Sequence, residues 1–160
     1  MDKRHPDNLA KRGGTIRERV GRVLDGLPVG KEFDWVPEVS IELTTQMLAT
    51  LFDFPFEDRR KLTRWSDVTV AEPGSGIIDS WEQRNNELMD CANYFQRLWN
   101  ERVNTDSGSD LISILAHSPA TRNMTAENYL GNAVLLTVGG NDTTRNSMTG
   151  AVLALHQHPA

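Results

Sequence analysis

The chain has 160 residues, of which 38% are hydrophobic, enough for one ordinary core or for part of a larger domain. Its formal net charge of −5 offers no electrostatic footprint for nucleic acid, and its one cysteine, Cys91, excludes an internal disulfide and weakly favours a reducing compartment. It contains neither an apolar run long enough to span a membrane nor the apolar core of a secretory signal, so we expect a cytoplasmic protein.

The first half of the chain shows apolar residues at three- and four-residue spacing, which predicts helices. We expect one helix over Asn8–Leu27, a second over Ser40–Phe52, and a third from Phe56 or Glu57 through Val68. Between the first two, residues 32–36 alternate polar and aromatic side chains, which predicts a short strand or an extended connector.

The second half begins with the clearest loop of the chain, Glu72–Gly76, which the two isoleucines 77 and 78 follow. A long amphipathic helix is expected over Ser80–Val103, and a short one over Leu111–His117, capped by Asp110. Thr125 is expected to cap a long final helix that ends near His156. The prediction is an all-α chain in which residues 1–160 form one domain or part of one.

The final predicted helix is interrupted by small and polar residues. Gly139 and Gly140 are adjacent in its interior, where each glycine costs about 1 kcal/mol relative to alanine. Asp142 and Thr143 then add an acid and a hydroxyl, which a packed core disfavours. The combination of two glycines and two polar residues in one helix interior requires an explanation. We expect a functional explanation, because local rules are usually broken at functional sites.

On a helix, Leu135, Gly139 and Thr143 share one face because they lie at four-residue steps. The missing Cβ atoms of the two glycines let a small or flat group approach the backbone, or let the helix bulge locally. Asp142 and Thr143 at the edge of this opening could pass protons from water to a buried reacting atom. The spacing fits a packing role equally well, with the glycines admitting a second helix and Asp142 paired with Arg145 or another neighbour.

The segment Gly139–Thr144 resembles the oxygen-activation signature of cytochrome P450 monooxygenases, in the helix that crosses the distal face of the haem. The similarity continues through Arg145–Gly150, Leu153–Leu155 and Pro159, as in the longer form found in bacterial soluble P450s. From Ile16 onward the chain also resembles bacterial alkane-hydroxylase P450s, in the segments Ser40–Leu48, Phe52–Pro55, Arg64–Asp67, Gly74–Ile78, Asp110–Ser113 and Ala116–Met124.

The resemblance implies roles for the residues of the signature. Thr143 would hydrogen-bond the reacting oxygen or its water, and Asp142 would gate the incoming protons. Gly139, Gly140 and Thr143 would line the distal haem face and the groove for O2. Leu135 and Val138, together with Gly139, would face the substrate above the haem.

The resemblance also implies cofactors and partners. The parent enzyme would bind haem b, use O2, and draw electrons from NAD(P)H through a ferredoxin and a ferredoxin reductase. It would hydroxylate the terminal carbon of a medium-chain alkane or a similar apolar molecule. The loop Glu72–Ile78 would flex between two lid helices, with Ile77 and Ile78 as an apolar mouth for that substrate.

Several parts of the family pattern are not found in the sequence. The cysteine that holds the haem iron through its thiolate lies outside this chain, as do the Glu-x-x-Arg helix and the large early sheet. No metal ligand is therefore assigned, and Cys91, in a lid helix, is expected to be an inert packing residue. We expect the chain to be the helical middle portion of a P450, inactive by itself, and the gene beyond Ala160 to encode the missing cysteine.

Two other classes of function remain open. One is a non-catalytic helical binding module in which Gly139 and Gly140 serve close helix packing. The other is an enzyme that uses the two glycines as an anion-binding turn, which requires a strand before them and a helix that begins at them. The helical pattern of Tyr129–Val138 disfavours this second alternative.

Overall fold

The computed structural model describes residues 6–159, which form helices joined by loops, with no β-strand among these residues. The all-α prediction is therefore confirmed for this part of the chain. None of the described helices is long and apolar enough to cross a membrane. In chain order the elements are α1 (Pro6–Asp25), the π-helix η1 (Val36–Ile41), α2 (Glu42–Phe52), the 3-10 helix η2 (Phe56–Asp58), α3 (Arg60–Val70), α4 (Trp81–Val103), α5 (Leu111–His117) and α6 (Ala126–Gln157).

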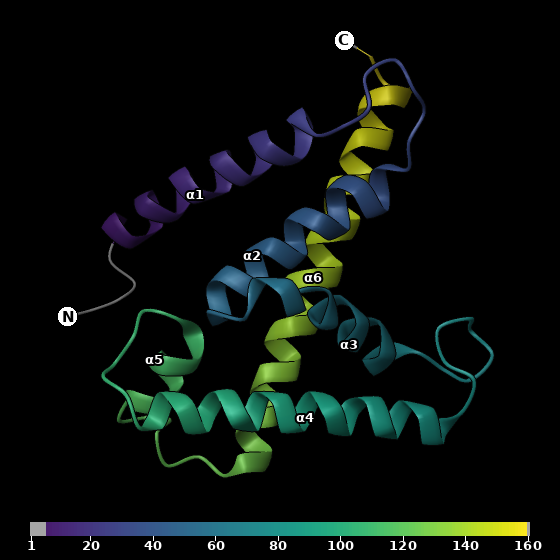
Figure 1. Ribbon diagram of the computed structural model, residues 1–160. Coiled ribbons are helices and arrows are strands. Elements are labelled where there is room, and N and C mark those ends of the chain that lie inside the picture. Colours follow the sequence, from purple (N-terminus) through teal and green to yellow (C-terminus); the bar gives the residue numbers. More distant parts are fainter. Residues whose placement is uncertain (1–5, 160) are drawn as a thin grey trace.

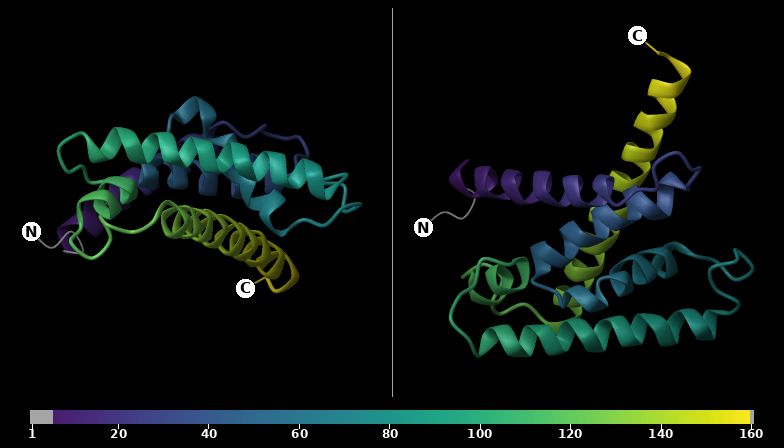
Figure 2. Two further views of the ribbon diagram at one scale, coloured as in Figure 1. Left: turned by 90° about the horizontal axis from the view of Figure 1, so that it is seen from below. Right: turned by 45° about the horizontal axis from the view of Figure 1, so that its top comes forward.

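The longest helix, α6, runs through the whole length of the molecule (Figure 1). It packs against η1, α2, α3 and α4, while α1 packs on α2 and η1. Seen from below, α6 lies on one side of the other helices, and its far side is bare (Figure 2). One long face of α6 is therefore covered by the rest of the described chain, and the opposite face is not.

The core between α2, α3 and α4 is aromatic. Phe54 stacks on Tyr94 at 4.6 Å between ring centroids, and Trp65 meets Tyr94 edge-on at 5.6 Å. Tyr129 on α6 is buried and donates its hydroxyl proton to the Phe95 carbonyl oxygen at 3.0 Å. Such aromatic pairs add about 0.5–1.5 kcal/mol each beyond the burial of their area. The hydrogen bond of Tyr129 anchors the N-terminal part of α6 to α4.

Side-chain caps set the starts of three helices. The Asp110 carboxylate accepts from the Ser113 amide at 2.9 Å, and the Thr125 hydroxyl accepts from the Asn128 amide at 3.2 Å. Both caps were predicted, and both are confirmed. Ser80 caps α4 in the same way. Each such cap stabilises its helix by about 1 kcal/mol, and these three helices begin where the sequence predicted.

The strand suggested for residues 32–36 is wrong. Residues 32–34 have no regular secondary structure, and a π-helix begins at Val36, four residues before the predicted helix start. Pro37 lies in the first turn of this helix, where its missing amide proton is tolerated. The Val36 amide donates to the Asp34 carboxylate at 2.9 Å, which turns the connector into the helix.

The loop after α3 closes on itself. Gly74 and Gly76 adopt positive φ angles of 86° and 82°, which favour glycine, and the Gly74 amide donates to the Ile78 carbonyl oxygen at 3.1 Å. Ile78 is only 1% exposed and packs against Val68. The expectation that Ile78 forms an open apolar mouth is therefore wrong for this conformation, because the side chain serves to anchor the loop. Ile77 is half-buried beside it.

The two adjacent glycines of α6 have different surroundings. A Cβ atom built on Gly140 would lie 2.8 Å from Cδ2 of Leu48, a buried residue of α2. A Cβ atom on Gly139 would meet nothing within 4 Å. Gly140 thus permits the close approach of α6 to α2, as the packing interpretation expected. That interpretation gives no reason for Gly139.

Alanine substitutions separate the two roles. Gly139→Ala should raise the free energy of unfolding by about 1 kcal/mol, because alanine is the better helix former and meets no neighbour. Gly140→Ala brings the same helix benefit but must displace the buried Leu48, so its gain should be cancelled or reversed. Urea unfolding of the full-length protein without bound cofactor measures both changes. Equal stabilisation by the two substitutions would contradict the packing role of Gly140.

Candidate active site

Three consecutive residues of α6 point in three directions, because successive side chains of an α-helix are turned by about 100°. Asn141 is 0% exposed and contacts Thr44 of α2. Asp142 is half-buried and contacts Ser66 of α3. Thr143 is exposed. The side of α6 that contacts the other helices therefore ends at Asp142. Thr143 lies on the opposite side, which we call the bare face and which Leu135, Gly139 and Thr143 mark.

The bare face carries the residues that the sequence predicted to share it. Leu135 is 69% exposed, and Gly139 and Thr143 follow it along the helix, both exposed. Val138 lies beside this line and is half-buried. Because no side chain and no other helix lies within 4 Å of the Cβ position of Gly139, a flat group can reach the helix backbone there. The structure thus brings together Leu135, Gly139 and Thr143 as predicted.

The Thr143 hydroxyl is oriented by its own helix. It donates to the Gly139 carbonyl oxygen at 2.5 Å, which leaves its oxygen lone pairs available as acceptors. The hydroxyl of Ser147, one turn further along, donates to the Thr143 carbonyl oxygen at 2.8 Å. The local bulge that the glycines were expected to permit is not present, since α6 is a continuous α-helix from Ala126 to Gln157.

Asp142 is held by a polar network that joins α6 to α3. Its Oδ1 atom accepts from Arg145 Nη2 at 2.9 Å and from the Ser66 hydroxyl at 3.2 Å. Arg145 also donates through Nη1 to Asp67 at 3.1 Å. The pair between Asp142 and Arg145 is the one that the packing interpretation expected. The acid is therefore anchored, and its position depends on α3.

Sequence reasoning missed three residues of this region: Asn141, Ser66 and Asp67. Ser66 and Asp67 belong to a segment that was noted only for its family resemblance. Asn141 stands inside the signature, but nothing in the pattern indicated that its side chain faces α2. Helical spacing shows which residues of α6 share a face. Only the packing of α2 and α3 shows which of those faces each of these two helices covers.

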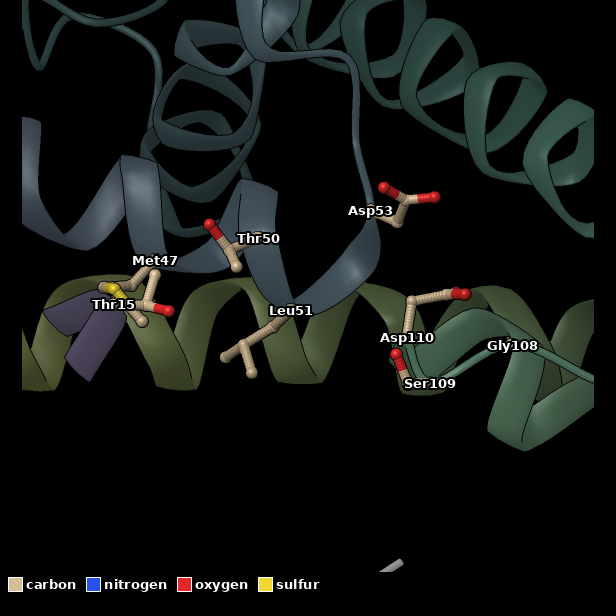
Figure 3. A pocket seen from close by; sticks show the side chains of 8 residues that line it. All are labelled: Thr15, Met47, Thr50, Leu51, Asp53, Gly108, Ser109 and Asp110. Atoms are coloured by element: carbon tan, nitrogen blue, oxygen red, sulfur yellow. The ribbon is translucent and has the colours of Figure 1, made fainter. Parts of the chain in front are cut away.

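One cavity lies away from the signature. It has a volume of about 440 Å³, with Thr15 and Met47 at one end and residues 108–110 at the other (Figure 3). Two carboxylates at this cavity, Asp53 and Asp110, lie 3.0 Å and 3.6 Å from the guanidinium of Arg102. None of the lining residues comes from α6, so this cavity is separate from the Gly139–Thr143 face. Its lining residues are Thr15, Met47, Thr50, Leu51, Asp53, Gly108, Ser109 and Asp110.

Cys91 lies in the hydrophobic core and is not positioned to bind a cofactor. Burial raises the pKa of its thiol to about 12, so the neutral thiol predominates at physiological pH. Its assignment as an inert packing residue is consistent with this environment. Within the described residues, no group of three or more His, Cys, Asp and Glu side chains is arranged to hold a metal ion.

Sequence comparison finds relatives that are monooxygenases, although no family model matches the chain. Over 155 residues the chain is 30% identical to linalool 8-monooxygenase of Pseudomonas putida. Over 157 residues it is 29% identical to steroid C26-monooxygenase of Mycobacterium tuberculosis. These alignments cover 96% of this chain in both cases, but only 38% and 35% of the two relatives. The chain thus spans little more than a third of the length of the relatives it matches.

Structural comparison gives the same result at higher identity. Cytochrome P450-153 from Novosphingobium aromaticivorans is 47% identical and superposes with a TM-score of 0.82, covering 97% of this chain and 37% of the other. CYP153D17 from Sphingomonas sp. PAMC 26605 is 44% identical, with a TM-score of 0.80 and coverages of 95% and 38%. With its all-α fold and the signature on α6, the chain belongs to the cytochrome P450 superfamily, of which it represents a helical segment.

Proposed function

We propose that this chain is the central part of a haem-thiolate monooxygenase that hydroxylates an aliphatic substrate, with medium-chain alkanes as the substrate class. The observation that carries the proposal is the bare face of α6, where Leu135, Gly139 and Thr143 lie in line beside the acid Asp142. The substrate class rests on the resemblance to alkane-hydroxylase P450s and on the apolar character of Leu135 and Val138.

The residues of the bare face fit a flat apolar cofactor. Gly139 presents helix backbone without a side chain, and the adjacent Leu135 and Leu136 are exposed apolar side chains. Haem, when bound, supplies the oxidising chemistry, and the cysteine that ligates its iron belongs to a part of the parent protein outside this chain. Within this chain, the task of the residues is to position the reactants, exclude water and deliver protons.

The proposed reaction requires two protons at one place. One atom of O2 enters a C–H bond of the substrate, and the other leaves as water, with two electrons from NAD(P)H through a ferredoxin and its reductase. Thr143, with its own proton donated to Gly139, can accept a hydrogen bond from a water molecule or from a protonated oxygen atom. Asp142, one residue away, would pass protons from solvent to that water as a general acid.

Leu135 and Val138 offer an alkane only apolar contact. Selectivity among alkanes would therefore depend on the shape and depth of the substrate pocket. Entry would depend on the loop Glu72–Ile78, which we propose to be the moving part of a lid. Because Ile78 is buried against Val68, opening of this loop would require Ile78 to leave its site. The lid would then have a defined closed state with an apolar anchor.

Removal of the Thr143 hydroxyl should uncouple electron transfer from product formation. In the full-length haem-bound protein, Thr143→Val should raise the hydrogen peroxide released per NAD(P)H consumed several-fold, because the hydroxyl no longer holds the proton-carrying water. Thr137→Val is the matched control, since Thr137 makes the same bond to its own helix, to Ala133 at 2.8 Å, but on the covered face. Equal peroxide release by the two variants would contradict the role of Thr143.

Removal of the acid should slow proton delivery. Asp142→Asn retains the shape of the side chain but not its proton chemistry, and should lower the turnover number by about 100-fold, the lower end of what a positioned acid contributes. Asp67→Asn weakens the same network through Arg145 yet leaves the Asp142 acid in place, so it should lower turnover far less. A larger loss in Asp67→Asn than in Asp142→Asn would show that the network has only a structural role.

The substrate class can be tested directly. The full-length protein, supplied with a ferredoxin, its reductase and NAD(P)H, should convert a medium-chain alkane to the primary alcohol, as gas chromatography of the products would show. Linalool and a steroid serve as competing substrates, because relatives act on these compounds. Turnover of either one in preference to the alkane would overturn the assigned substrate class while leaving the monooxygenase assignment intact.

A further inference from the structure

Asn141 is a buried amide at the interface of α6 and α2, between Gly140 and Asp142. Its side chain is 0% exposed, and its Oδ1 atom lies 2.9 Å from the Thr44 hydroxyl oxygen, whose one proton it shares with the Ser40 and Ile41 carbonyl oxygens at 2.9 Å and 3.1 Å. Its Nδ2 atom is buried and has no hydrogen-bond partner among the described residues. A buried donor without a partner destabilises the fold, whereas an apolar side chain of similar size would fill the same space without that cost. Packing alone therefore does not explain an amide here.

A hydrogen bond is directional, and apolar contact is not, so a buried polar pair can fix one arrangement among several of similar packing. A second polar pair lies along the same interface, where the hydroxyls of Ser40 and Thr149 are 3.0 Å apart. Leu48, which faces Gly140, lies on the same side of α2 as Thr44, one turn away. These three contacts, at successive turns of η1 and α2, hold α6 in place and oppose its rotation about its own axis.

Rotation of α6 matters because of where Thr143 lies. Two residues along an α-helix correspond to about 200°, so Thr143 is almost opposite Asn141. At a side-chain radius of about 5 Å, each 10° of rotation moves the Thr143 hydroxyl by about 1 Å. A displacement of about 1 Å of a reacting group can lower a rate about 100-fold. A small loss of rotational constraint at Asn141 would thus be amplified on the opposite face.

We propose that Asn141 is a positioning residue, bound by Thr44, which fixes the rotation of α6 and so aims Thr143 and Asp142 at the reacting oxygen. The proposal rests on the function proposed above. It assigns α2, which lies on the side of α6 away from the bare face, a defined part in proton delivery.

The test compares two neighbouring threonines of α2 in the full-length haem-bound protein. Thr44→Val removes the bond to Asn141, together with the contacts of the same hydroxyl with the Ser40 and Ile41 carbonyl oxygens. Thr45→Val is the matched control, because Thr45 is also fully buried, but its hydroxyl pairs with Thr63 of α3 at 2.6 Å and not with α6. The measurements are hydrogen–deuterium exchange of the amides of residues 139–147, thermal unfolding, and peroxide released per NAD(P)H consumed.

We expect Thr44→Val to raise both the exchange rates and the peroxide fraction at least threefold. Thr45→Val should change neither, although both variants lower the unfolding temperature. The double variant Thr44→Val with Asn141→Leu adds a further check, because it leaves no unpaired polar group. It should recover stability, since two apolar partners pack well, while its peroxide release stays high. Peroxide release that returns to normal together with stability would show a merely structural role and overturn the proposal.

The remaining outcomes are also decisive. Equal effects of Thr44→Val and Thr45→Val on exchange and peroxide release would refute the positioning role. If Thr143→Val leaves peroxide release unchanged, the proposed function fails, and the exchange rates alone then decide whether the bond between Thr44 and Asn141 constrains α6. Faster exchange confined to Thr44→Val would support that constraint, and unchanged exchange would refute it.

Discussion

The close contact between α6 and α2 at Gly140 sets which side of α6 faces the other helices. Because Gly140 has no side chain, Leu48 can approach the backbone of α6 closely. That approach buries Asn141 against Thr44 and, by the geometry of the helix, turns Thr143 to the bare side. This close approach thus places Asn141 inside the interface and leaves Thr143 outside it.

Asp142, the acid of the signature, has contacts that join it to α3 and a proposed part in proton delivery. Its contact with Ser66, and the contact of its partner Arg145 with Asp67, tie Asp142 to α3, the helix that leads into the loop closed by Ile78. Partly exposed ion pairs of this kind contribute at most about 1 kcal/mol, so their main effect is on position and not on stability. Any movement of α3 during substrate entry would be transmitted to Asp142, which couples the proposed lid to the proposed proton path.

Helix positions and caps were predictable because they depend on local signals, such as the caps at Asp110 and Thr125. The shared face of Leu135, Gly139 and Thr143 was also predictable, since it follows from helical periodicity alone. The different roles of the two adjacent glycines were not, because they depend on where Leu48 lies in space. The suggested bulge was wrong for a related reason: a missing Cβ atom permits a distortion but does not require one.

A crystal structure of the full-length protein with its haem would show which face of α6 the haem meets. We expect Gly139 and Thr143 to line the distal side of the haem, while Asn141 keeps its bond to Thr44 on the opposite side of α6. A structure in which protein covers the bare face of α6, with the haem elsewhere, would refute the proposed role of this face.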